Sequence, residues 1–561
     1  MNKTFKTIWN EARRSYIVTN ETQKTHGKPS KCAVALAIAT TAFLSLGAAQ
    51  AAYVDPGLVA TSYKNVDQAV ASWETTEYKA DWGLEAMHAS KAYALGYHGQ
   101  GVAVGVMDSG AYLYHHPDLS GNRFHASVAK GEYSGTGVRY PQGALPQFDA
   151  DYEAGESFDI TGEWVLDTND SHGTHVTGTV GGNRDGNEFH GVAWGSDVWV
   201  GNTGGTDDSN YGPFLDYGYF RTAWGNIAQD LIAANGAERG GVINNSFGTN
   251  TRVVDPDGGA TTTNNKGQKV SVVTNPGYDG GNTDVHFKTN STAETEYEYF
   301  LFRDNKNYQQ TANENGWGSF VDAAWEAVKG TNVVQVFTTG NRDMHNPFYR
   351  PLYPYFNPEA EQNWIAVAGL KKDSGSGETA KYSLIDTFNE AGNAKWWTVA
   401  APGDKIYSSA VVEGSYIEPD SKGYEGTKLG DAVYASWGGT SMAAPHVTGA
   451  MGVIMSRYQD MNAIQARTVL FTTANHKNPD GTNMEGWQNV ASAKWNEADK
   501  KWDVTYEEVP EGEVSNRMGW GVPDLDKAMY GPGQFLGKFG GADKKLDFLN
   551  DTIIPSELHR T

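Results

Sequence analysis

The sequence predicts an α/β fold of three layers, with helices on both faces of a doubly wound, mostly parallel sheet and with loop or β insertions. Short runs of β-branched and apolar residues alternate with helical patterns along most of the chain. Several runs are apolar throughout, which is typical of strands buried on both faces. Polar turn residues follow these runs directly, and in open α/β sheets functional groups gather at the carboxyl ends of strands.

The alternation rests on apolar residues at helical or strand spacing, bounded by glycine, proline or polar turns. The elements expected in chain order are a helix over 86–95, a strand over 101–107, a helix from about 171, a strand in GVAWGSDVWVGN, a helix over 219–235, the strand GVINN, a helix over 319–328, strands over 333–337 and 364–369, helices that begin near 441 and 462, and a last helix in GWGVPDLDKAM.

Four parts are expected along the chain. Residues 1–51 form a leader, 52–80 a short N-terminal segment, 81–530 the main domain and 531–561 a tail. Two stretches interrupt the main domain. An insertion at about 249–316 is rich in Thr, Asn, Gly and Asp and has strand-like pieces at 269–273 and 296–302, and a polar excursion follows at about 476–515.

Composition excludes some classes of function. The 561 residues carry a formal net charge of −23, with a pI near 5.0, and a nucleic-acid partner would require a basic face instead. The single cysteine, Cys32, lies in the leader, so we expect no disulfide in the mature chain. We expect a monomer that relies on its core or on bound ions, without a transmembrane segment in the mature chain.

The leader has the features of an export signal. Basic residues up to Lys31 precede an apolar segment from Ala33 to Leu46, and Ala49-Gln50-Ala51 suits cleavage after Ala51. The apolar segment is too short to span a membrane as a helix.

The stretch WGGTSMAAPHVTGAM predicts a tight turn that leads into a helix with Ser441 in its first turn. A serine in that position can attack a substrate, and the helix N-terminus favours a developing negative charge nearby. The alternative is that Thr440 or Ser441 is only an N-cap. Pro445 is compatible with a first-turn position because it forfeits no intrahelical bond there.

Three reactive groups follow strands or open helices, in the order Asp108, His172, Ser441. A serine hydroxyl requires a base within hydrogen-bond reach, and that base requires a carboxylate to fix its tautomer. Asn341, in a tight turn after a strand, could donate to an oxyanion together with the Ser441 N–H group. His172 and His175 could instead be metal ligands, but no third ligand is apparent in the sequence.

Seven motifs resemble, in order, those of subtilisin-like serine proteases (peptidase family S8). They span about residues 82–530 and are VAVGVMDSG, NDSHGTHVTGTVGG, GVA, NNSFG, TTGN, AAPGDKIYS and GGTSMAAPHVTGAM. The resemblance implies a serine endopeptidase acting on protein or peptide substrates. Its catalytic residues would be Asp108, His172 and Ser441, with Asn341 as oxyanion donor.

The resemblance also implies a substrate-binding strand at Ser246, Phe247 and Gly248, beside a pocket wall that includes Thr339 and Gly340. No cofactor is required for the chemistry. Members of the family often bind structural calcium, and the oxygen donors at plausible places are Asp118, Asp185 and Asn187. We make no assignment of a metal site.

The long basic region of the leader resembles the extended signal peptides of type V secreted proteins of Gram-negative bacteria, and the chain as a whole resembles autotransporter subtilisin passengers. This implies export to the periplasm, the cell surface or the medium. Such passengers normally precede a C-terminal translocator domain, which we do not expect within residues 531–561. The alternative function is a catalytically idle subtilisin-fold adhesin. A sedolisin-like acid peptidase would need Glu in place of His172 and Asp in place of Asn341.

Overall fold

The computed structural model describes most of the chain between residues 66 and 532. The described residues are 5–10, 15–20, 66–134, 153–204, 217–247, short strands between 252 and 274, 320–341, 345–496, 498–499 and 501–532. The expected strand-like piece at 296–302 and nearly all of the expected tail lie outside these residues.

The main sheet has the strand order β15-β14-β13-β8-β3-β7-β4, and β16 pairs with β14. Neighbouring strands from β4 to β14 run parallel, as do β14 and β16, whereas β15 runs antiparallel to β14. The strands are β3 (Ala103–Asp108), β4 (Phe124–Ala126), β7 (Asp197–Asn202), β8 (Gly241–Asn245), β13 (Val333–Thr338), β14 (Trp364–Ser374), β15 (Lys381–Leu384) and β16 (Thr398–Pro402). The predicted mostly parallel sheet is confirmed.

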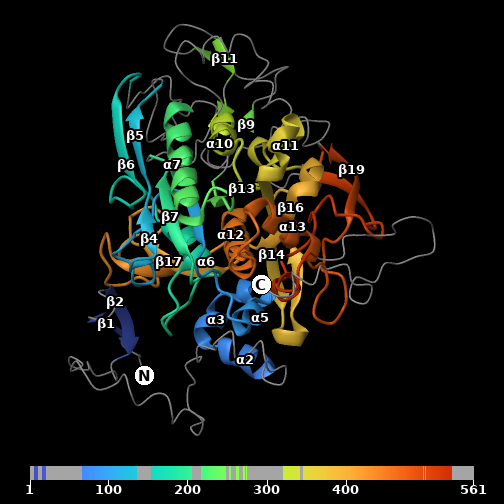
Figure 1. The fold of residues 1–561 in the computed structure, drawn as a ribbon, viewed down its shortest axis with the longest axis horizontal. Helices are drawn as coiled ribbons and strands as arrows, with labels where there is room; N and C mark the ends of the chain where they lie inside the picture. The colour runs from blue at the N-terminus through green and yellow to red at the C-terminus, as the bar shows by residue number, and fades with distance from the viewer. Residues whose placement is uncertain are drawn as a thin grey trace.

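Helices cover both faces of this sheet (Figure 1). Helices α7 (Tyr217–Asn235) and α10 (Phe320–Val328) lie on one face, and α6 (His172–Gly181) and α12 (Thr440–Arg457) lie on the other. Successive residues of β3 show the two faces. A side chain at Gly105 would meet Ile227 of α7, whereas Val104 lies against Gly452 of α12. The three-layer prediction is therefore confirmed.

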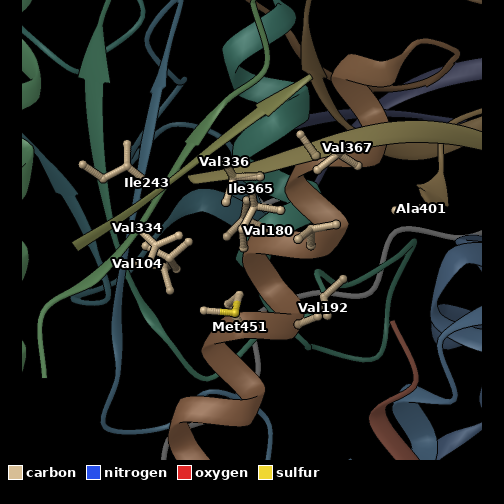
Figure 2. Close-up of a cluster of buried hydrophobic side chains, with 14 of the residues drawn as sticks. Val104, Val180, Val192, Ile243, Val334, Val336, Ile365, Val367, Ala401 and Met451 are labelled. Carbon is tan, nitrogen blue, oxygen red and sulfur yellow. The ribbon is translucent and has the colours of Figure 1, made fainter. Parts of the chain in front are cut away.

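The core lies between the sheet and α12. Figure 2 shows β-branched side chains of the strands β3, β13 and β14 on the side of the sheet where Met451 of α12 and Val180 of α6 lie. The β-branched residues suit the pleated strands, and small residues on α12 let the helix approach closely. Close packing here fixes the distance of α12 from the sheet and its orientation, and therefore the position of the residues in its first turn.

The N-terminal helices pack on the same core. Trp73 at the end of α2 (Val66–Trp73) and Tyr78 in α3 (Thr76–Ala80) are buried in it. Between α3 and α4 (Trp82–Ala86), Asp81 accepts a hydrogen bond from the Gly83 N–H group, and its other oxygen lies 2.9 Å from His446 Nε2 on α12. Both members of this pair are almost fully buried. The pair attaches the N-terminal segment to the helix that carries Ser441.

Replacement of Asp81 by alanine is expected to lower the free energy of unfolding by about 3–5 kcal/mol, because it leaves His446 buried without its partner. Urea denaturation monitored by tryptophan fluorescence would measure the loss. Asp67→Ala, at an exposed site in α2, is the control and should change stability by less than about 0.5 kcal/mol. A fully stable Asp81→Ala variant would contradict the role given to the pair.

One of the predicted helices is divided into two in the structure. The helix predicted over 86–95 is divided between α4 and α5 (Ala89–Ala94), so that prediction was wrong. His88, between the two, has a left-handed backbone (φ 55°), which interrupts the helix, and its Nδ1 lies 3.0 Å from Asp524 Oδ1. A contact with a residue far along the chain therefore accompanies the break.

The remaining elements are short helices and two-stranded hairpins around this core. They are β1 (Phe5–Asn10), β2 (Ser15–Asn20), β5 (Val128–Glu132), β6 (Ser157–Thr161), β9 (Arg252–Val253), β10 (Thr261–Thr263), β11 (Lys269–Ser271), β12 (Val273–Thr274), β17 (Ile406–Val411), β18 (Ala432–Trp437), β19 (Asn489–Asn496), β20 (Lys501–Glu507), α11 (Tyr349–Phe356), α13 (Ala463–Thr473), α14 (Leu525–Ala528) and the 3₁₀ turns η2 (Pro117–Leu119), η4 (Pro358–Asn363), η5 (Gly377–Thr379) and η6 (Gly392–Trp397).

The two predicted interruptions contain paired strands. Strands β9–β12 lie in the insertion, and β19 and β20 form a hairpin in the polar excursion. The other predicted helices and strands are present, with ends that differ by a few residues. Within the part of the chain that the structure describes, no helix has the length and hydropathy needed to cross a membrane. The division of the chain at residues 52, 81 and 531 stays a prediction.

Candidate active site

Three neighbouring parallel strands, β13, β8 and β3, end at the same edge of the sheet. Asp108 is the last residue of β3, Ser246 follows β8, and Asn341 lies three residues beyond β13. Helices α6 and α12, which pack against each other, begin with His172 and with Thr440-Ser441. The fold therefore gathers the predicted site residues at the ends of elements that are in contact.

Asp108 and His172 form a direct pair. Asp108 Oδ1 lies 2.7 Å from His172 Nδ1 and also accepts the N–H group of Ser109 at 2.8 Å. The Asp108 side chain is 3 % exposed and that of His172 is 20 % exposed. A carboxylate on Nδ1 fixes the imidazole tautomer that carries its proton there, so that Nε2 is the nitrogen able to accept a proton.

A second carboxylate lies beside this pair. Asp170 Oδ1 accepts the backbone N–H of His172 at 2.8 Å, and the Asp170 carbonyl accepts the Ser109 hydroxyl at 3.2 Å. The same Ser109 oxygen accepts the N–H of Gly173 at 2.6 Å. These bonds hold the turn after β3 against the start of α6. Burial raises the pKa of Asp170 to about 6, although the nearby His172 lowers it.

His175 has a structural environment. Its Nε2 lies 3.1 Å from each of the carbonyl oxygens of Ile406 and Ala435, and its ring stacks on Trp437. Burial lowers the pKa of His175 to about 3, so the ring is neutral. His175 therefore joins α6 to the β17–β18 hairpin, and the structure does not place it with His172 around a metal.

The first turn of α12 is held against the end of β8 by two reciprocal bonds. The Ser441 hydroxyl donates to the Ser246 carbonyl at 2.7 Å, and the Ser246 hydroxyl donates to the Ser441 carbonyl at 2.7 Å. Ser246 also accepts an N–H of the Asn244 side chain, whose oxygen accepts the Thr448 hydroxyl. Ser441 is partly exposed, and these bonds fix the position of the turn that carries it.

The side chain of Asn341 is oriented by α12. Its Oδ1 accepts both the N–H group and the hydroxyl of Thr440, each at 2.9 Å. Because a backbone N–H can only donate, this contact assigns Oδ1 and directs Nδ2 elsewhere. A Cβ built on Gly439 would lie 3.5 Å from Asn341 Nδ2 and 3.5 Å from the Ser441 backbone nitrogen. Two N–H donors therefore flank the same glycine, next to Ser441.

The turn that carries Asn341 is held by hydrogen bonds to Asn389. Thr339 has no exposed surface, and its hydroxyl donates to the Asn389 carbonyl at 2.7 Å. Asn389 bonds back to the carbonyls of Thr339 and Gly340. Gly340 has φ 117°, and a Cβ there would lie 2.4 Å from the Phe348 ring, so only glycine fits. The side chain of Thr339 thus supports the turn, and its contact with substrate stays a prediction.

The predicted substrate strand is described in part. Ser246 and Phe247 are buried, and the Phe247 ring lies parallel to that of Trp224 on α7. Gly248 lies outside the described residues. Their role in substrate binding stays a prediction.

The residues considered for calcium do not form one ligand set. Asp118 is buried, and its Oδ2 accepts the Tyr434 hydroxyl at 2.5 Å. Asp185 Oδ1 accepts the N–H of Asn187 at 3.0 Å in an exposed turn. Within the described residues, no three His, Cys, Asp or Glu side chains gather as around a metal ion. On these contacts Asp118, Asp185 and Asn187 do not act together as one calcium site, and calcium binding itself stays untested.

Sequence reasoning missed three structural roles. It did not single out Asp170, although a second acid two residues before His172 in NDSH was a visible signal. It also missed the contact between Asn389 and Thr339, which lie 50 positions apart, and the Asp81–His446 pair, whose members lie 365 positions apart. Nothing local in the sequence marks such partners.

Two protein-family models match the chain. The model of the subtilase family matches residues 99–521, and the chain belongs to that family. A second model, the extended signal peptide of type V secretion systems, matches residues 1–50. The leader therefore marks the chain for export to the periplasm, the cell surface or the medium, as predicted.

Two curated relatives are similar over 80% and 40% of this chain. The extracellular serine protease of Serratia marcescens is 29% identical over 459 residues, which cover 80% of this chain and 36% of that protein. The autotransporter lipoprotein NalP of Neisseria meningitidis is 25% identical over 40% of this chain and 17% of its own length. A solved serine protease of Aeromonas sobria is 17% identical, covers 81% of this chain and 66% of that one, and gives a TM-score of 0.45. The chain thus spans about a third, or less, of the length of these curated relatives.

Proposed function

We propose that this chain is a secreted serine endopeptidase that hydrolyses peptide bonds through an acyl-enzyme. The observation that carries the proposal is the direct Asp108–His172 contact at the same sheet edge as Ser441 and Asn341. Membership of the subtilase family supports it. Its substrates are protein or peptide segments in extended form.

In the proposed acylation step, His172 Nε2 takes the proton of the Ser441 hydroxyl while Oγ bonds to the carbonyl carbon of the substrate. For this the hydroxyl turns from the Ser246 carbonyl towards the imidazole, since catalytic hydrogen bonds often form only in the complex. Asp108 stabilises the imidazolium that results. The carbonyl oxygen gains a negative charge, which the Asn341 Nδ2 and Ser441 N–H groups bind.

Collapse of this tetrahedral intermediate breaks the C–N bond, and His172 gives its proton to the departing amine. A water molecule then enters, loses a proton to His172 and attacks the acyl carbon. The second intermediate expels Ser441 Oγ, which recovers the proton from His172. The backbone at Ser246–Gly248 would pair with the substrate as an added strand and align the bond with Ser441.

A fluorophosphonate probe tests the proposal directly, because it labels a serine that is activated by a neighbouring base. We expect labelling of the purified wild-type chain and none of Ser441→Ala. The control is Ser415→Ala, at an exposed serine of the β17–β18 hairpin, which should label like wild type. Absence of labelling in correctly folded wild type would overturn the proposal in favour of an idle, adhesin-like subtilisin fold.

Replacement of Asp108 by asparagine is expected to reduce kcat by about 10⁴-fold, because the amide would hold His172 in the wrong tautomer. The size is the one known for the same substitution in another serine protease, and the carboxylate here makes the same contact with Nδ1. Steady-state kinetics on a chromogenic peptide would measure it. Asp404→Asn, in the loop before β17, is the control and should retain most activity. An Asp108→Asn variant within tenfold of wild type would contradict the assigned role.

A further inference from the structure

His172 lies where the dipole of its own helix disfavours the protonated form of the imidazole. His172 is the first residue of α6, a helix of ten residues. The N-terminus of a helix carries a partial positive charge of about half a unit, which disfavours a cation in its first turn. The imidazolium of the proposed mechanism forms in just that place. A negative group at the helix start would offset this effect.

Asp170 supplies that group. Its Oδ1 accepts the His172 N–H at 2.8 Å, one of the amides that the helix leaves without an internal partner. Ser171, between the two, makes no side-chain cap and instead accepts the N–H of Val411 through its hydroxyl. The Asp170 carboxylate is therefore the anionic group that caps α6 next to the catalytic imidazole.

We propose that Asp170 is a positioning residue of the catalytic centre, whose carboxylate offsets the positive end of α6 and keeps the His172 imidazole basic enough to accept the Ser441 proton. The inference rests on the proposed function, because it concerns how the base of that mechanism is tuned. It goes further in giving the site two carboxylates with different roles. Asp108 orients the ring through Nδ1, and Asp170 acts through the helix terminus and through space.

The charged groups that face Asp170 are His172 on α6 and Asp108 at the end of β3. The other elements packed on this turn contribute neutral groups at their contacts: the Ser109 hydroxyl, the Asn202 side chain on Asn169 and the Val411 amide of β17. Burial raises the pKa of Asp170 to about 6, and the charge of His172 works against that rise. By reciprocity, an ionised Asp170 raises the pKa of His172.

Asp170→Asn separates charge from capping, because an asparagine oxygen can still accept the His172 N–H. With the charge removed, the imidazolium is less stable, so the pKa of His172 falls. The acid limb of the kcat/KM profile is then expected to move to lower pH by about 0.5–1 unit, since that limb reports the base of the free enzyme. A weaker base also lowers the alkaline plateau of kcat by about three- to tenfold, with KM nearly unchanged.

Asp167→Asn is the matched control, since it removes one charge from the same loop at an exposed site. Its left-handed backbone (φ 62°) also accommodates asparagine. Its profile should match wild type. If Asp170 is only a cap, Asp170→Asn will have the wild-type pH profile, and that result overturns the inference. Asp170→Ala loses the cap as well as the charge, so it should melt earlier and also show the shifted acid limb; a wild-type acid limb in Asp170→Ala would likewise overturn the inference. Fluorophosphonate labelling of wild type distinguishes this failure from failure of the proposed function.

Discussion

Replacement of Ser441 by alanine is expected to reduce kcat for peptide hydrolysis by about a million-fold, the scale found when a triad serine is removed from a subtilisin. The reason is that the acyl-enzyme route closes completely once no oxygen can bond to the substrate carbonyl. The remaining rate would come from binding and oxyanion stabilisation alone. Hydrolysis of a chromogenic peptide at high concentration of the variant would measure it, after treatment with the fluorophosphonate probe to inactivate any contaminating wild-type enzyme.

The structure gives this experiment a matched control. The Ser441 side chain makes one described hydrogen bond, to the Ser246 carbonyl, so its loss should leave the thermal unfolding midpoint within a few degrees of wild type. Ser246→Ala removes the reciprocal bond to the Ser441 carbonyl but keeps the nucleophile. We expect kcat of the Ser246→Ala variant to fall by about tenfold or less. Equal activity of Ser441→Ala and wild type would refute the nucleophile assignment.

The parallel sheet was predictable because its strands are buried on both faces and therefore read as continuous apolar runs. The same runs end in polar turns, which is why Asp108 and Asn341 could be assigned to one edge of the sheet. Strand ends were less accurate. The strand predicted to end at 369 continues to Ser374, because beyond the parallel part its last residues pair antiparallel with β15. That pairing partner lies in a separate segment and leaves no periodic signal in β14.

What the sequence could not predict are the bonds that orient the site residues. Ser246 was expected to contact substrate, and in the structure it also fixes the first turn of α12 through its hydroxyl. Thr339 was expected in a pocket wall, which stays a prediction, and in the structure its hydroxyl donates to the Asn389 carbonyl. Each of these bonds joins residues 50 or more positions apart, so it depends on how the sheet and helices stack and not on local propensity.

A further large effect is expected at Asn341. Asn341→Ala is expected to reduce kcat by about 10²–10³-fold with little change in KM, because the Nδ2 donor binds charge that exists only in the transition state. The size is the value known for the equivalent donor in subtilisin, and the argument for Nδ2 here is structural. Thr440 holds Oδ1 through two hydrogen bonds, which leaves the amide nitrogen directed to the side of Gly439 and Ser441.

Alanine at 341 also removes the acceptor for the Thr440 N–H and hydroxyl, so a loss of activity could come from a displaced helix start. Thr440→Val separates the two effects. It removes the hydroxyl bond to Asn341 but keeps the N–H bond and the Nδ2 donor, and we expect it to lose no more than about tenfold in kcat. If Thr440→Val lost as much as Asn341→Ala, the role of Asn341 would be support of α12. If Asn341→Ala raised KM and left kcat unchanged, its amide would bind ground-state substrate and not the oxyanion.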